Sequence, residues 1–316
     1  MIHLRLTVPT AQVAEVRATL EEDPHVVNLL HLPGVATRPA GDAIFCDVPR
    51  EHASVVLHRL RGLGLHQTGG ITAEYVDVAI DDRSQRAVRA APGSAADAVL
   101  WEGVEAQTEE ISELSQAFLI FMVLGSLLAA VAIFLDSPIL MVGAMVVGPE
   151  FGPIAAASVA LATGRARLAA RSAAALGVGL PLAILAAWLF TVIGRWVGLH
   201  PDDFAGASHL LAGAISKPDV YAGIVAVVAG VAGLLSLTTA KSGALVGVLV
   251  SVTTIPAAAN IGVALGYGDE DGWLGSAGQL GLNIVLMFAA GVLTLYLQRL
   301  GYQRRLRRER AHAGDG

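Results

Sequence analysis

The sequence contains little charge and almost no cysteine. Of its 316 residues, 15% are charged and 54% are hydrophobic, whereas roughly a quarter of an average soluble protein is charged. Cys46 is the single cysteine, which excludes a disulfide within the chain. The first ten residues, MIHLRLTVPT, lack the apolar core that a signal peptide needs. The composition therefore predicts a membrane protein without a cleaved leader and without a disulfide framework.

The sequence also lacks the common catalytic and nucleotide-binding motifs. It contains no HExxH, no GxSxG, no P-loop and no pair of catalytic carboxylates. We therefore expect no enzyme and no cofactor, and the missing P-loop argues against transport driven by ATP. The basic C-terminal tail has no interleaved aromatic residues, so we expect it to set topology and contact anionic lipid rather than bind nucleic acid. Its arginines are Arg304, Arg305, Arg307, Arg308 and Arg310.

Residues 1–80 predict a small α+β domain. Apolar and polar residues alternate in four segments, as in strands, and two other segments have helical spacing. The strands are expected at 2–8, 26–32, 43–48 and 71–80, and the helices at 10–22, capped by Thr10, and at 50–63. The order βαββαβ is that of a ferredoxin-like fold.

Six of the nine histidines lie in this domain, so a metal site or a pH sensor is one interpretation. No two of them have the i, i+4 spacing that places two ligands on one helix face, and Cys46 lies in no CxxC motif. The sequence therefore favours surface histidines and predicts no metal site. The six are His3, His25, His31, His52, His58 and His66.

Residues 81–116 are predicted to link this domain to the rest of the chain. The segment 81–94 is polar and contains the break Pro92-Gly93. The segment 95–116 returns to helical spacing and has an acidic face. Because anionic lipid would repel that face, we expect an amphipathic helix that packs on protein and continues into the first membrane helix.

Residues 117–300 predict an α-helical polytopic membrane domain, which the tail 301–316 follows. A span needs about 20 apolar residues, and six segments qualify: 117–135, 139–163, 168–196, 220–239, 243–265 and 274–299. Basic residues follow the second, fourth and sixth spans, whereas the opposite loops are acidic or nearly neutral. The positive-inside rule then puts both termini in the cytoplasm and the chain in the cytoplasmic (inner) membrane.

The second span carries a carboxylate near its centre. Glu150 lies in GPEFGP, the segment 148–153. Proline removes a helical hydrogen bond, and glycine is the least favourable ordinary residue in a helix, so this segment predicts a broken helix. Charge and irregular backbone at membrane depth occur where they are buried in protein or line a water-filled cavity. We therefore interpret the segment as part of a functional site.

The membrane domain contains an internal repeat with an offset of 104 residues. The segment from Ile139 aligns without a gap with the segment from Gly243, and eight of twenty-six positions are identical. The same offset superposes the first span on the fourth and the third on the sixth. Three spans per repeat is an odd number, so the repeats must be inverted, as in many transporters. Close helix packing would explain the glycines and alanines, but neither Glu150 nor the paired breaks.

The second break supplies hydroxyl and amide groups where the first supplies Glu150. It comprises SVTTIP, residues 251–256, and Asn260 follows it. We predict that the broken second and fifth helices form one site for an ion or solute. Its residues would be Gly148, Pro149, Glu150, Gly152, Pro153, Ser251, Thr253, Thr254, Pro256 and Asn260. Secondary candidates are Asp136 and Ser137, which suit a helix cap, Lys241, which suits a topology charge, and Asn283, which suits a hydrogen bond between helices.

Two segments of the chain resemble the signatures of a known family. DSPILMVGAMVVGPEFGPI and KSGALVGVLVSVTTIPAAANIGVAL are similar to segments of bacterial and archaeal hydrophobic membrane proteins of unknown function, domain of unknown function 389. The resemblance covers roughly residues 100–300, and the N-terminal domain also looks like that of family members. Members often have Ala-Pro or Pro-Pro at the two breaks. The resemblance implies the fold and brings no substrate.

These patterns favour a secondary transporter or channel-like protein for an ion or small solute, embedded in membrane lipid. The cytoplasmic domain would regulate it or assemble it as a homo-oligomer. The alternative is a membrane-anchored sensor or scaffold, whose cytoplasmic domain binds a ligand or partner while the spans only anchor or signal.

Overall fold

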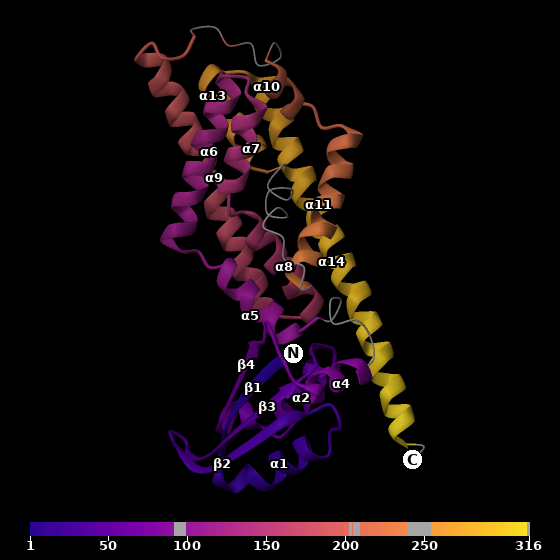
Figure 1. Ribbon diagram of the computed structural model, residues 1–316. Helices are drawn as coiled ribbons and strands as arrows, with labels where there is room; N and C mark the ends of the chain where they lie inside the picture. Colours follow the sequence, from indigo (N-terminus) through magenta and orange to yellow (C-terminus); the bar gives the residue numbers. More distant parts are fainter. Residues whose placement is uncertain (92–98, 202–203, 205–208, 239–253, 315–316) are drawn as a thin grey trace. The chain divides into compact units, whose positions relative to one another are not determined.

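A computed structural model describes residues 1–91, 99–201, 204, 209–238 and 254–314 (Figure 1). Three of the predicted site residues, Lys241, Ser251 and Thr253, lie outside the described residues. The chain divides into two compact units. The N-terminal unit consists mainly of Met1–Val104, and the C-terminal unit consists of Glu105–Leu237 and the segment that leads to the C-terminus.

The N-terminal unit contains a four-stranded antiparallel sheet in the order β2-β3-β1-β4. Its strands are β1 (Ile2–Pro9), β2 (Val27–Thr37), β3 (Ala40–Val48) and β4 (Gly70–Tyr75). Its helices are the 3-10 turn η1 (Thr10–Gln12), α1 (Val13–Glu21), α2 (Arg50–Gly62), α3 (Leu65–Thr68) and α4 (Asp82–Ala90).

Alternation along the two central strands builds the core of this unit. Every second residue of β1, from Ile2 to Val8, is buried, and the same holds for β3 from Ile44 to Val48. The apolar faces of α1 and α2 join the same cluster, through Val16, Leu20, Val56, Leu57 and Leu60. The sheet and these helices therefore share a single apolar core.

Local details of this unit correct the sequence-based expectations. Thr10 does not cap α1, because it lies in η1, and the residue before α1 is Gln12, whose side chain makes no cap hydrogen bond. The fourth strand ends at Tyr75 and not at Ile80. Tyr75 pairs with Ile2, the first residue of β1. One further backbone hydrogen bond joins the Val76 amide to the Met1 carbonyl at 3.2 Å, and the pairing ends there. Val78 and Ile80 are accordingly exposed.

The linker also differs from its prediction. Asp81 caps an unexpected helix, α4, by accepting a hydrogen bond from the Ser84 amide at 2.7 Å. The next helix is α5 (Trp101–Ile111), and four residues separate it from α6 (Gln116–Phe134). The predicted continuous helix into the membrane is wrong, because the Ser115 hydroxyl caps a separate α6 by accepting from the Phe118 amide at 3.1 Å.

Two acidic residues of α5 form ion pairs with Arg165, whereas Glu110 is exposed. Arg165 lies just before α9, and its guanidinium contacts Glu105 at 3.3 Å and Glu109 at 2.8 Å. These ion pairs lie within the C-terminal unit, which begins at Glu105 inside α5.

The C-terminal unit is a bundle of apolar helices, and its composition is that of a membrane protein. Four helices are long and apolar enough to cross a membrane: α6, α9 (Ala166–Trp196), α11 (Val220–Thr238) and α14 (Glu270–Gly314). A bent pair, α7 (Pro138–Val147) with α8 (Phe151–Thr163), makes a fifth candidate if it forms one span. The described part of the chain thus holds four or five candidate spans, not the six expected.

The predicted fifth span is described only in part. The described portion is α13 (Ile255–Tyr267), which is shorter than the four long helices. A short helix, α10 (Leu210–Ile215), precedes α11. Large apolar side chains on the outer faces of the long helices are exposed, for example Phe121, Leu185, Ile224 and Leu293. Such faces suit contact with lipid rather than with water.

The helices of the two halves of this unit keep the offset of the sequence repeat. α6 and α11 begin and end 104 residues apart, and so do α8 and α13. α9 and α14 begin 104 residues apart. Gly164 and Gly268 end α8 and α13 in the same left-handed conformation, with φ of 75° and 72°.

Candidate functional site

The break between α7 and α8 is caused by three consecutive residues. α7 ends at Val147, and the next residue, Gly148, has a ψ of 125°, which lies outside the helical region. Pro149 lacks the amide that would continue the helix, and Glu150 then precedes the first residue of α8. The axes of α7 and α8 differ by 51°. The predicted break is therefore confirmed, and it places a carboxylate at a helix end inside an apolar unit.

Glu150 meets the second predicted break. Its carboxylate Oε1 accepts a hydrogen bond from the Thr254 hydroxyl at 2.6 Å. Both residues are buried, with 1% and 0% of their surface exposed. Thr254 immediately precedes α13, and Pro256 lies in the first turn of that helix, where its missing amide costs nothing. Glu150 and Thr254 thus face each other at the beginnings of α8 and α13.

Glu150 and Thr254 are 104 residues apart, so each is the other's counterpart in the repeat. A second set of contacts is reciprocal in the same way. Arg195 donates to the Gly266 carbonyl at 2.7 Å, and Arg299 donates to the Ala162 carbonyl. The two arginines that donate are 104 residues apart, and the two residues whose carbonyls accept are also 104 residues apart.

Two glycines of the first break lie against other groups too closely for a side chain. A Cβ atom on Gly148 would lie 2.4 Å from the Glu150 carboxylate and 2.5 Å from Ile255. A Cβ atom on Gly152 would lie 2.5 Å from the Ile111 carbonyl, at the end of α5. Gly148 therefore allows the two breaks to approach, whereas Gly152 packs α8 on α5. Pro153 is buried in α8.

Asn260 belongs to a different polar cluster. Its side-chain amide donates to the Ser216 and Ser276 hydroxyls at 2.9 and 2.8 Å. It also approaches the Ala212 carbonyl at 3.5 Å. These contacts join α13 to α10 and α14 and are separate from the hydrogen bond between Glu150 and Thr254. A structural role explains them fully.

The secondary candidates are structural where they are described. Ser137 caps α7 by accepting from the Leu140 amide. Asp136 does cap a helix, but the helix is the distant α10. Its carboxylate accepts hydrogen bonds from the Leu210 and Leu211 amides at 3.1 and 2.8 Å. Asn283 is fully buried and accepts from Gln279 of the same helix at 3.2 Å.

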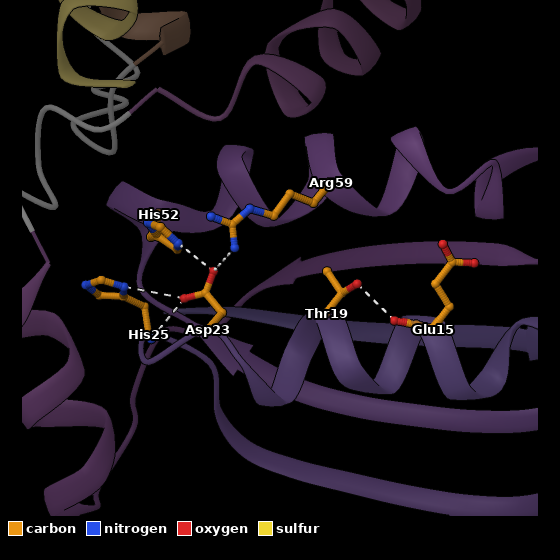
Figure 2. A network of polar contacts seen from close by, with 6 residues as sticks. All are labelled: Glu15, Thr19, Asp23, His25, His52 and Arg59. Atoms are coloured by element: carbon orange, nitrogen blue, oxygen red, sulfur yellow. Dashed lines mark hydrogen bonds and ion pairs between the residues drawn. The ribbon is translucent and has the colours of Figure 1, made fainter. Parts of the chain in front are cut away.

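The structure also brings together a group that sequence reasoning missed. Asp23, His25 and His52 of the N-terminal unit converge with their donor atoms within 4.8 Å of one another (Figure 2). The His52 ring Nε2 lies 2.9 Å from Asp23 Oδ2, and the His25 ring Nδ1 lies 3.4 Å from Asp23 Oδ1. Arg59 donates to Asp23 Oδ2 at 3.0 Å. The spacing rule missed this group because its members come from two separate segments.

Asp23 remains ionised in this group. Its burial opposes ionisation, but hydrogen bonds from His52 and the His25 amide, with the charges of His52 and Arg59, outweigh burial and lower its pKa to about 2. The carboxylate therefore presents a full negative charge to both imidazole rings at neutral pH.

Comparison with known proteins finds a similarity within the C-terminal unit. The family model described as Domain of unknown function (DUF389) matches residues 145–289, which include both breaks. This match confirms the resemblance that the two signature segments predict. An uncharacterized protein of Methanocaldococcus jannaschii is 26% identical over 159 residues, which is 50% of this chain and 47% of that protein. The chain thus matches about half the length of this relative. No solved structure matches the chain.

Proposed function

We propose that this membrane protein is a secondary transporter or a channel-like protein for an ion or small solute. In this proposal Glu150 binds a cation or exchanges a proton. The observation that carries it is the buried hydrogen bond between Glu150 and Thr254 at two helix ends. A carboxylate is costly inside an apolar helical bundle, and such groups generally mark ion pathways or proton relays.

An inverted repeat of three helices each supports the proposal. The bounds of α8 and α13, and of α6 and α11, differ by 104 residues. The arginine contacts are reciprocal, as contacts across a two-fold axis are. A residue that touches its own counterpart, as Glu150 touches Thr254, is expected to lie close to such an axis. In transporters with inverted repeats, interrupted helices form the binding site near the midplane of the membrane.

The topology and the N-terminal unit belong to the same proposal. In this proposal the chain crosses the cytoplasmic (inner) membrane six times. The basic loops then lie on the cytoplasmic side, and so do both termini. The sheet order β2-β3-β1-β4 supports a ferredoxin-like unit. Leu30, Leu32 and Val35 on the edge strand β2 are 61%, 48% and 54% exposed. This apolar edge favours pairing between copies, and hence a homo-oligomer that the N-terminal unit assembles or regulates.

Flux in proteoliposomes tests the proposal. The purified chain is reconstituted into vesicles that contain a dye sensitive to H⁺, K⁺ or Na⁺, and a gradient of the matching ion is imposed in each case. We expect wild-type flux for one of these ions, a loss of at least tenfold in Glu150→Gln, and a smaller loss in Thr254→Val, since that variant keeps the carboxylate. Glu110→Gln is the matched control, because Glu110 is an exposed residue of α5. Equal flux in Glu150→Gln and Glu110→Gln would contradict the role of Glu150.

The alternative function, a membrane-anchored sensor or scaffold, is favoured by a different observation. The group Asp23, His25 and His52, of which Asp23 and His52 are buried, gives the N-terminal unit a chemically distinct cluster of its own. A sensor would bind its ligand there and show no flux under any imposed gradient. Absence of flux in the wild-type chain would therefore favour this second function.

A further inference from the structure

We propose that Asp23, His25 and His52 form a binding site for a divalent transition metal, for which Zn²⁺ is the probe. Two imidazole nitrogens and one carboxylate oxygen are donors that zinc and its neighbours accept. Magnesium and calcium, in contrast, prefer oxygen alone. The inference concerns the N-terminal unit and does not depend on transport by the C-terminal unit.

The spacing of the donor atoms suits a single ion. All three lie within 4.8 Å of one another, and the contacts of Asp23 with His52 and His25 are 2.9 and 3.4 Å. Ligand bonds to zinc are about 2.0–2.2 Å, so two donors on one tetrahedral ion lie roughly 3.3 Å apart. A small movement of the side chains would therefore admit the ion.

The backbone arranges these donors in advance. Asp23 and His25 lie between α1 and β2, where the Asp23 carboxylate accepts the His25 amide at 3.0 Å. His52 lies in the first turn of α2. The two rings are 4.3 Å apart between centroids, and both face the same carboxylate (Figure 2). Three donors from two separate segments thus converge before any ion binds.

One ring nitrogen makes no hydrogen bond among the described residues. His25 Nδ1 is buried and makes no hydrogen bond there, although it faces Asp23 Oδ1. A buried polar atom without a hydrogen bond costs free energy, and a metal ion would compensate for it. The side chains of Asp23 and His52 are 3% and 6% exposed, whereas His25 is 21% exposed. The ion would therefore enter past His25.

Arg59 is compatible with this site. Its guanidinium donates to Asp23 Oδ2 at 3.0 Å and is 51% exposed. Carboxylates that ligate metals are commonly held by such outer hydrogen bonds. The simpler interpretation is an ion-pair network alone, in which Arg59 and His52 donate hydrogen bonds to Asp23, whereas His25 Nδ1 lies 3.4 Å from Asp23 Oδ1 and makes no hydrogen bond among the described residues.

Titration of the full chain with Zn²⁺ in detergent tests the proposal. The protein is purified through a tag without histidine, stripped with EDTA, and titrated by isothermal calorimetry. Binding of Co²⁺, followed by its visible absorption, reports whether nitrogen ligands are present. We expect one ion per chain, and at least a tenfold loss of affinity in His25→Gln and in His52→Gln. His58→Gln is the control, because His58 is an exposed residue of the same helix α2.

Each outcome either supports or overturns the proposed metal site. Affinity lost in His25→Gln and kept in His58→Gln would support the site. No binding to the wild-type chain, or equal binding to His25→Gln and His58→Gln, would overturn it. If His52→Gln fails to fold, His25→Gln still decides, because His25 Nδ1 makes no hydrogen bond among the described residues that this substitution would remove. Flux through the C-terminal unit is measured separately, so failure of one proposal leaves the other standing.

Discussion

Cys46 is fully buried on β3, and this burial controls the reactivity of its thiol. Burial, with a smaller effect of the Asp47 charge, raises its pKa to about 12. Since the thiolate is the nucleophile, we expect the folded protein to react with Ellman's reagent at pH 8 far more slowly than the denatured protein. Absorbance of the released thiolate measures both rates. Rapid reaction of the folded chain would contradict the burial of Cys46.

The same pKa shift predicts how the stability of the folded protein changes with pH. An unfolded thiol ionises near pH 8.5, whereas the folded thiol keeps its proton up to about pH 12. Stability from this group is therefore present below pH 8.5 and is lost as the pH rises toward 12, by up to about 1.4 kcal/mol per pH unit. We expect the melting temperature of wild type to fall more steeply than that of Cys46→Ala between pH 8 and 10. Parallel curves for the two proteins would contradict this prediction.

Access of water to the two breaks can be measured with single cysteines. The background is Cys46→Ala, because serine would leave a hydroxyl at a position with 0% exposure. If the proposed pathway exists, Glu150→Cys and Thr254→Cys react with membrane-impermeant thiol reagents from at least one side of the membrane. The control is Ala258→Cys, in α13 at 0% exposure. Labelling of 150 and 254 no faster than that of 258 would mean a closed, packed interior.

At the scale of helices, α13 and α9 pack at a distance that only glycine allows. A Cβ atom on Gly262 would lie 2.5 Å from the Ile184 carbonyl and 2.6 Å from the Ala187 side chain. Because a helix backbone cannot yield as a side chain can, we expect Gly262→Ala to destabilise the protein by about 1–3 kcal/mol. Thermal denaturation in detergent, followed by tryptophan fluorescence, measures the change.

A second glycine of the same unit provides the matched control for Gly262. On Gly281, in α14, a Cβ atom would meet nothing within 4 Å. There the substitution should stabilise the helix by about 0.5–1 kcal/mol, because alanine loses less backbone entropy. Equal melting temperatures for the two variants would contradict the prediction that α13 packs on α9 too closely for a side chain at position 262.

Elements could be predicted from sequence where a local pattern determines them. Apolar runs predicted α6, α9, α11 and α14, and the sequence Gly148-Pro149-Glu150 predicted the break. The end of β4 could not be predicted, because it depends on where its partner β1 begins. Apolar and polar residues continue to alternate as far as Ile80, although β4 stops pairing with β1 before that residue.

Sites that depend on distant contacts were only partly predictable. The repeat offset aligned Glu150 with Thr254, and these residues do meet. Asn260, also expected at this site, instead bonds to Ser216 and Ser276, because its position on α13 faces α10 and α14. Asp23 and His52 are 29 residues apart, and no spacing rule for a single helix reveals a site of that kind.

At the scale of the whole molecule, the two units have separate apolar clusters. Leu100 is 4% exposed and packs in the cluster of the N-terminal unit, so the chain should be divided after Val104 rather than near residue 80. The cluster around Met122, Ile133 and Ile255 belongs to the other unit. We therefore expect residues 105–316 to insert, fold and remain monodisperse in detergent without the N-terminal unit.

The truncated chain also separates the two proposed functions. If the C-terminal unit transports and the N-terminal unit regulates, residues 105–316 keep measurable flux in proteoliposomes and this flux still requires Glu150. Zn²⁺ binding is lost at the same time, because Asp23, His25 and His52 are absent. The flux of the truncated chain with Glu150→Gln is the control. A truncated chain that is monodisperse yet carries no flux, when the full chain does, would mean that the N-terminal unit is needed for transport itself.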